Sequence, residues 1–135
     1  MDKKLVGLML IFMLAFGLFA TITVFNKPLS RLTRAKEESL ASSESSLIFA
    51  WPLTTTVNTK VNINVFVRNA LNVPLVNKNV TVSTSLGTIN NAVMVTDKGG
   101  KSTFILESNT PGIAQIKATV DGTTEIKQKI SIQFE

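Results

Sequence analysis

The sequence predicts an all-β sandwich preceded by one transmembrane helix, and three observations support this prediction. Residues 5–25 contain no charged side chain. Apolar and polar residues alternate downstream of Leu47, which is the two-residue period of a strand with one buried face. Turn-forming residues separate these runs at short spacing, and no helical period lies between them.

Residues 1–25 are interpreted as an N-terminal signal anchor. At about 1.5 Å per residue, a helix from Leu5 to Phe25 is roughly 31 Å long, which matches the hydrocarbon core of a bilayer. Two lysines before an apolar run also begin a removable secretory signal. The apolar run here is longer than such a signal normally has, and the best cleavage position, after Ala20, has Leu18 where a small residue is needed. We therefore expect an uncleaved anchor that contacts membrane lipid.

Residues 26–46 are predicted to form a juxtamembrane helix or a flexible linker. Pro28 suits the first turn of a helix. A thin apolar stripe follows at Leu29, Leu32, Ala35 and Leu40. Such a helix would be either a solvated stalk or a surface for self-association or for a partner. Residues 39–46 (SLASSESS) are small and polar without a period, which predicts a flexible tether.

Residues 47–135 are predicted to contain about seven strands. The clearest is KVNINVFVR, in which Val61, Ile63 and Val65 alternate with other residues. The other β-rich runs lie at 47–51, 79–83, 92–96, 101–108, 113–120 and 125–134. Turn residues separate several of them, at 97–100, 111–112 and 121–122. Seven short strands without an intervening helix favour a two-sheet antiparallel sandwich of the immunoglobulin type.

Residues 96–120 resemble the bacterial immunoglobulin-like group 1 (Big-1) family of invasin and intimin, whose pattern is TDxxGxAxxxLxSxTxGxAxVxAxV. The matching residues are Thr96, Asp97, Gly100, Leu106, Ser108, Thr110, Gly112, Ala114, Ala118 and Val120, with Ile116 in place of Val. Residues 72–82 are similar to the family's GNPVANQTVTF-like segment, so the resemblance covers roughly residues 60–134. It implies a stiff spacer or adhesive module on a bacterial surface. This chain differs in having a single such unit and an N-terminal helix in place of an outer-membrane barrel.

Composition argues against catalysis and nucleic-acid binding. The chain has no cysteine and no histidine, which removes the commonest general base, thiolate nucleophiles and most zinc ligands. The carboxylates of the β region have no spacing that suggests an acid–base pair or a calcium loop. The net charge of +5 is spread along the chain and not clustered. We predict no catalytic residue, no cofactor, no metal site and no nucleic-acid partner.

Four aromatic residues are considered for contacts. Phe66 and Phe104 are placed on the polar phase of their strands, so they are expected either to form an exposed contact pair or to cover a sheet edge. Phe49 and Trp51 point to one face of an extended strand. We expect Trp51 to pack against the sandwich, with a position at the lipid interface as the alternative.

The sequence therefore predicts a non-catalytic, single-pass membrane protein that presents one immunoglobulin-like domain for structural spacing or adhesion at the cell surface or in the envelope. An alternative is a pilin-like filament subunit whose apolar helix packs in a filament core, and a third is a subunit of an envelope complex. The lysines and arginines flanking the apolar run favour a cytoplasmic C-terminal domain by the positive-inside rule. We nevertheless expect an extracytoplasmic domain, because domains of this type are usually found there.

Overall fold

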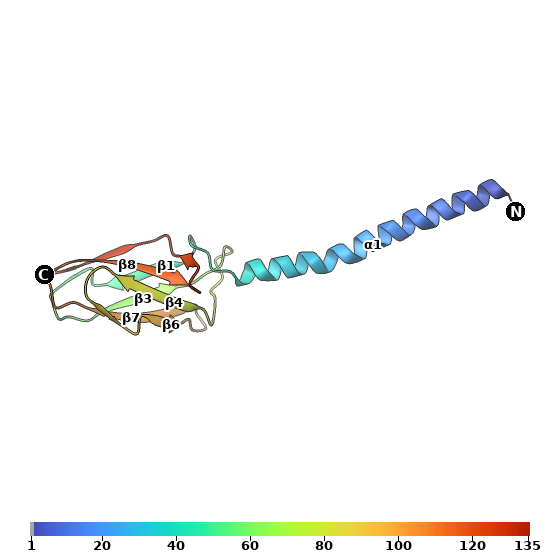
Figure 1. The fold of residues 1–135 in the computed structure, drawn as a ribbon. Coiled ribbons are helices and arrows are strands. Elements are labelled where there is room, and N and C mark those ends of the chain that lie inside the picture. Colours follow the sequence, from blue (N-terminus) through green and yellow to red (C-terminus); the bar gives the residue numbers. More distant parts are fainter. Residues whose placement is uncertain (1) are drawn as a thin grey trace. The chain divides into compact units, whose positions relative to one another are not determined.

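The computed structural model describes residues 2–135, except for the side chains of residues 24–38. The chain divides into two compact units, residues 1–36 and residues 37–135 (Figure 1). The first unit belongs to a helix, and the second contains every strand of the described chain. The expected apolar stripe at Leu29, Leu32 and Ala35 lies outside the described side chains.

Helix α1 (Lys3–Ser39) contains a segment that is long and apolar enough to cross a membrane. This segment, Lys3–Thr23, has a mean hydropathy of 2.6, and it is not buried within the protein. The hydroxyls of Thr21 and Thr23 donate to carbonyl oxygens three and four residues earlier, at 2.8–3.1 Å. These polar groups are therefore satisfied inside the helix, as a lipid environment requires.

The β domain consists of two facing sheets. The four-stranded sheet has the order β1 (Leu47–Trp51), β3 (Val61–Phe66), β7 (Lys101–Glu107), β5 (Thr88–Asn90). The second sheet has the order β2 (Thr54–Thr55), β10 (Ile130–Phe134), β8 (Gly112–Val120), β4 (Asn79–Thr84), β6 (Val93–Val95), and β9 (Thr124–Glu125) pairs with β8. All pairings are antiparallel except β2 with β10. The predicted β-sandwich is confirmed, and β2 and β5 are added segments too short for a sequence period to show. The run predicted at 125–134 is divided between the end of β9 and β10.

Each edge of the sandwich is formed by a chain segment that changes sheets. Strand β1 is the edge of the four-stranded sheet, and after Pro52 the chain continues as β2 at the edge of the other sheet. Proline has no N–H to donate to a ladder, so it suits this break. On the other side β5 passes into β6 at Asn91, which has a φ of 54°. Asparagine tolerates this left-handed conformation better than most residues.

The core lies between the sheets and is built from alternating positions of every long strand. Along β8, which lies within the β-rich run predicted at 113–120, the residues Ala114, Ile116, Ala118 and Val120 are all at most 1% exposed. The small alanines alternate there with larger side chains. The largest fully buried side chains are Phe104 and Phe134. Burial of each such aromatic side chain contributes on the order of 1.5–3 kcal/mol.

The expectation that Phe104 is an exposed contact point is wrong. Its side chain is 1% exposed and lies in the core between the buried residues Ser102 and Leu106 of β7. The inward phase of β7 begins with a polar serine, whereas the outward phase carries the apolar Ile105. Both phases are therefore mixed in polarity, and the two-residue period does not show which one is buried.

The segment just before β1 is bound to the domain and is not a free tether. The backbone N–H of Ser42 donates to the carbonyl of Arg68 at 2.7 Å, and the Ser46 hydroxyl accepts the Arg68 N–H at 3.1 Å. The Ser43 hydroxyl donates to the carbonyl of Glu125 at 2.6 Å. Serine hydroxyls complete the bonding of strand ends in this way. We call the end of the sandwich at which residues 42–46 are bound the proximal end.

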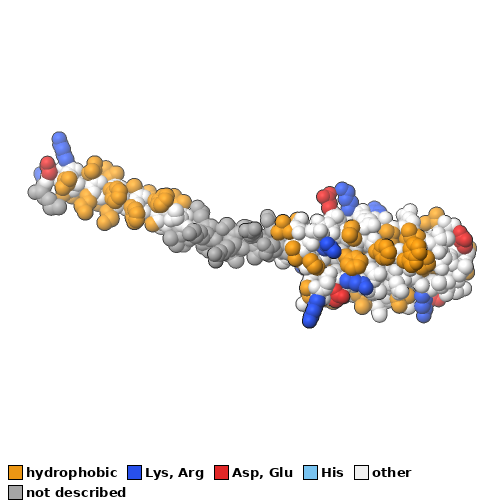
Figure 2. Space-filling view, turned by 180° about the vertical axis from the view of Figure 1, so that it is seen from behind, with side chains coloured by type: hydrophobic (Ala, Val, Ile, Leu, Met, Phe, Trp, Pro, Cys, Tyr) orange, Lys and Arg blue, Asp and Glu red, His pale blue; other side chains and the backbone are white. Residues whose placement is uncertain are grey.

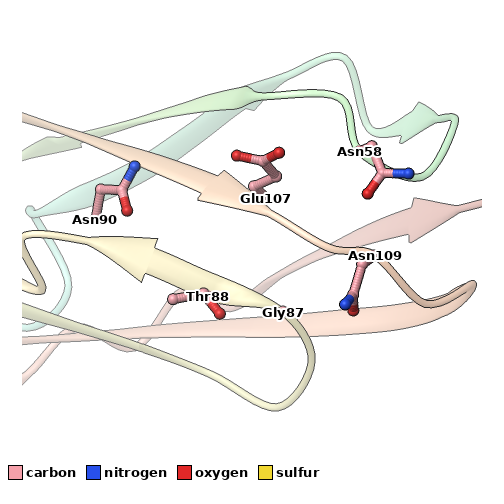
Figure 3. Close-up of a pocket in the computed structure, with 6 residues that line it drawn as sticks. All are labelled: Asn58, Gly87, Thr88, Asn90, Glu107 and Asn109. Carbon is pink, nitrogen blue, oxygen red and sulfur yellow. The ribbon is translucent and has the colours of Figure 1, made fainter.

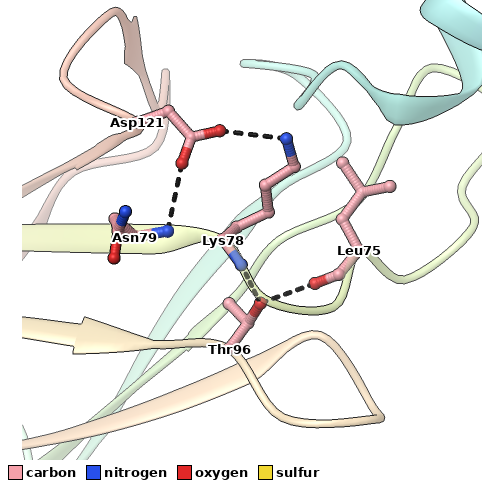
Figure 4. Close-up of polar contacts among 5 residues, drawn as sticks. All are labelled: Leu75, Lys78, Asn79, Thr96 and Asp121. Atoms are coloured by element: carbon pink, nitrogen blue, oxygen red, sulfur yellow. Dashed lines mark hydrogen bonds and ion pairs between the residues drawn. The ribbon is translucent and has the colours of Figure 1, made fainter.

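A second set of polar contacts holds loops together near the start of β4 (Figure 4). The buried hydroxyl of Thr96 donates to the carbonyl of Leu75 at 2.7 Å and accepts the N–H of Lys78 at 2.9 Å. The carboxylate of Asp121 accepts the N–H of Asn79 at 3.1 Å and pairs with the ammonium of Lys78 at 3.0 Å. The two bonds of the Thr96 hydroxyl fix the residue that follows β6, and the Asp121 contacts hold the start of β4.

Candidate functional site

The outer face of the four-stranded sheet carries a continuous set of exposed apolar side chains. Along β1, Leu47, Phe49 and Trp51 are 47%, 56% and 73% exposed, and they alternate with the buried residues Ile48 and Ala50. Figure 2 shows hydrophobic side chains gathered along one face of the β domain.

Strand β3 adds one aromatic side chain to this set. Phe66 lies directly opposite Leu47 in the antiparallel register, and it is half-buried. Residues directly opposite on one face of an antiparallel pair have neighbouring side chains. We call Leu47, Phe49, Trp51 and Phe66 the apolar row.

Polar but uncharged side chains border the apolar row on its β3 side. Asn64 lies opposite Phe49, and Asn62 lies opposite Trp51. The amide oxygen of Asn64 accepts the hydroxyl of Thr103 on β7 at 2.9 Å. Neither β1 nor β3 contains a charged residue. An apolar centre rich in aromatics with a polar border is typical of protein–protein contact surfaces.

The position of Trp51 differs from the favoured prediction. The expectation that Trp51 packs in the sandwich is wrong, because Ile48 and Ala50 occupy the inward phase of β1 and leave Trp51 outward. A position at the lipid interface stays a prediction. Every residue of LIFAW is apolar, so the sequence could not show which phase faces the core.

Phe66 and Phe104 do not form the exposed pair that we expected as one possibility. Phe66 is on the outer face of its sheet, whereas Phe104 is on the inner face of the neighbouring strand. Phe66 lies instead opposite Leu47, a pairing that the sequence alone does not predict. The signal that could have found this contact is the pairing register of β1 with β3, which the sequence alone does not give.

A polar hollow of about 270 Å³ lies elsewhere on the domain, lined by Asn58, Gly87, Thr88, Asn90, Glu107 and Asn109. Figure 3 shows Glu107 between Asn90 and the amides of Asn58 and Asn109. One carboxylate without an acidic or basic neighbour in the lining does not make an acid–base pair. Among the described residues, no group of three or more potential metal ligands occurs. The predicted lack of catalytic, cofactor and metal sites stays a prediction.

Comparison with known proteins gives matches among solved structures. Neither a protein-family model nor a curated protein sequence matches the chain. The D0–D1 domains of intimin are 28% identical with a TM-score of 0.61, covering 72% of this chain and 49% of that one. The adhesin InvE of Yersinia pseudotuberculosis is 22% identical with a TM-score of 0.63, covering 71% of this chain and 28% of the other.

Invasin, a bacterial integrin-binding protein, is 22% identical to this chain with a TM-score of 0.62. The match covers 71% of this chain and 20% of invasin. This chain thus spans half or less of the length of the three solved structures. The β domain therefore has an immunoglobulin-like fold similar to that of the intimin and invasin domains, which confirms the resemblance predicted from residues 96–120.

Proposed function

We propose that this immunoglobulin-like domain of the intimin and invasin type is a non-catalytic adhesion module, tethered to the cell membrane by helix α1 and contacting a protein partner through the apolar row. The observation that carries the proposal is the outward position of Phe49 and Trp51 on a sheet face without charged residues on β1 or β3. Full burial of one such side chain by a partner contributes on the order of 1.5–3 kcal/mol.

The tether is supported by the segment Lys3–Thr23, whose apolar side chains are not buried within the protein. An apolar helix of this length left in water would expose a large hydrophobic surface, and a bilayer removes that cost. The adhesive role is supported by the names of the similar proteins, because InvE is an adhesin and invasin binds integrins. The β domain is then extracytoplasmic, where such a partner is accessible.

The location of the β domain is tested in a bacterial strain that produces the full-length protein. Protease added outside intact cells should digest the β domain, and the intact mass of the undigested protein should include Met1. Resistance of the β domain in intact cells, with digestion after lysis, would contradict an extracytoplasmic location. A mature protein that begins at Leu8 would favour the filament subunit instead.

The contact surface is tested by placing the photo-crosslinking residue p-benzoylphenylalanine at position 49 in living cells. Leu71 is the matched control, because its side chain is 66% exposed, apolar and located outside the apolar row. We expect an adduct with a surface protein for Phe49→p-benzoylphenylalanine and a much weaker one for the same change at Leu71. Equal adducts at both positions, or none at position 49, would contradict a contact through the apolar row.

A further inference from the structure

We propose that β6 is a self-complementary edge strand, through which the β domain pairs with a second copy of this chain on a facing membrane. This inference rests on the proposed adhesive function and names one partner for it. It uses a surface different from the apolar row, because β6 ends the other sheet and lies at the other edge of the sandwich.

The register of β6 leaves part of its backbone directed away from the domain. The N–H of Val82 donates to the carbonyl of Ala92 at 2.9 Å, and the N–H of Thr96 donates to the carbonyl of Lys78 at 2.9 Å. In an antiparallel ladder the bonded residues alternate, so positions 92, 94 and 96 face β4. The N–H and C=O groups of Val93 and Val95 therefore point toward the open edge.

The side chains at this edge do not oppose pairing with another strand. Val93 and Val95 are 56% and 53% exposed. Residues 79–96, which include β4, β5 and β6, contain no Asp, Glu, Lys or Arg in a chain of net charge +5. Natural edge strands are commonly protected by charged side chains, proline or a covering segment. The side chains of β6 provide neither a charge nor a proline.

The edge formed by β1 differs from the edge formed by β6. The outward N–H of Ile48 donates to the side-chain oxygen of Gln128 at 3.0 Å. Lysines stand on both sides of that glutamine, at positions 127 and 129. One edge of the sandwich is therefore covered and flanked by charge, and the other presents valines with directed backbone groups.

Strand β6 is also held in place before any partner arrives. Thr96, the residue after it, is 2% exposed and bonded through its hydroxyl to Leu75 and Lys78 (Figure 4). At the other end, Ala92 is bonded to β4 through Val82. A strand fixed at both ends loses little conformational entropy when it pairs.

Two copies of β6 fit each other when they run antiparallel about a two-fold axis at Met94. Val93 of each copy then lies opposite Val95 of the other, and each such pair exchanges two N–H···O=C bonds. The four valine side chains meet on the outer face of the joined sheet. Two identical copies therefore bond each other's outward backbone groups, and no different protein is required.

The antiparallel pairing determines at which end of the pair each N-terminal segment joins its domain. Residues 42–46 are bound at the proximal end of each domain, so the two chains join their domains at opposite ends of the pair. This arrangement suits copies carried by facing membranes. A strand of three residues buries far less than the roughly 1,200 Å² of a stable interface, so the single contact is weak and adhesion requires many copies at once.

The test uses full-length protein reconstituted into lipid vesicles, with clustering followed by dynamic light scattering. Wild-type vesicles should cluster, and vesicles carrying Val93→Lys with Val95→Lys should cluster at least about tenfold more slowly, because lysines would face lysines. Vesicles carrying Val93→Glu with Val95→Glu should fail in the same way. A mixture of the lysine and glutamate vesicles should recover clustering, which a merely misfolded variant would not do.

The matched control is Gln115→Lys with Gln133→Lys, which adds the same charge to exposed positions on β8 and β10. It should cluster like the wild type. Wild-type clustering that survives the lysine pair at β6 would overturn pairing through this strand while leaving the adhesive function in place. Absence of clustering by wild-type vesicles would overturn pairing between copies, whereas the adhesive function would fail only if the crosslinking at position 49 also failed.

Discussion

Substitution of Gly100 by alanine tests whether the turn before β7 is fixed by backbone packing. Gly100 has a φ of 71°, and a Cβ built on it would lie 2.6 Å from the carbonyl oxygen of Val67 and 3.1 Å from the backbone nitrogen of Leu75. The same Val67 carbonyl accepts the Leu75 N–H at 2.9 Å, and the Val67 N–H donates to Gly100 at 2.8 Å. Relief of the clash must therefore disturb at least one buried backbone hydrogen bond.

The matched control is Gly122→Ala, because Gly122 has nearly the same φ of 70° and a Cβ there meets no described atom within 4 Å. A left-handed conformation costs a non-glycine residue about 1–2 kcal/mol. Alanine also lowers the conformational entropy of the unfolded chain, which offsets roughly 0.4–1 kcal/mol of this cost. Gly122→Ala should therefore lower the free energy of unfolding by about 1 kcal/mol. Gly100→Ala should lose a further ~1–3 kcal/mol for the disturbed hydrogen bond.

The assay is urea unfolding of the full-length protein in detergent, followed by pulse proteolysis of the β domain. With a urea dependence of about 1–3 kcal/mol per molar, a difference of ~2 kcal/mol separates the two midpoints by roughly 1 M. Midpoints that agree within about 0.2 M would refute the reasoning, because they would show that the contact with Val67 carries no cost beyond the φ angle.

Three further predictions use the same assay. Thr96→Val should lower the free energy of unfolding by about 1–3 kcal/mol, because the Leu75 carbonyl and the Lys78 N–H lose their bonds. Its control, Thr81→Val at an exposed position of β4, should change that free energy by less than about 0.5 kcal/mol. Similar losses for both variants would contradict a stabilising role of the Thr96 hydroxyl. Phe104→Ala should lower the free energy of unfolding by ~3–5 kcal/mol because it leaves a cavity in the core, and Phe66→Ala should lower it clearly less because Phe66 is half-buried. A larger loss for Phe66→Ala would contradict the inward position of Phe104. The N–H groups of Lys101 and Gly99 donate to the Asp97 carboxylate and lower its pKa. The stabilisation that the ionised carboxylate contributes is therefore present above the unfolded pKa of about 3.9, and it is lost as pH falls through the folded pKa. The stability difference between wild type and Asp97→Asn should therefore shrink as pH falls from 7 to 2.5, and a difference independent of pH would exclude this cause.

Some features of the β domain could be predicted from the sequence because they are written in neighbouring residues. The alternation from Ala114 to Val120 identified a strand with one buried face, and the turn at 97–100 was visible in its aspartate and glycines. The apolar run from Leu5 to Phe25 needed only length and hydropathy. Residues 42–46, by contrast, looked like a tether, because bonds from serine hydroxyls to Arg68 and Glu125 join positions far apart in the chain.

The sequence by itself determined the segment that suits a membrane and the β period of the domain, since both depend on the local order of apolar and polar residues. The tertiary structure decided which phase of LIFAW faces outward and that Phe104 is buried, because strands whose two phases are both partly apolar acquire an inside only when they pair. It also decided which strands end the sheets. The open edge at β6 and the covered edge at β1 exist only after strands from distant parts of the chain have taken their places.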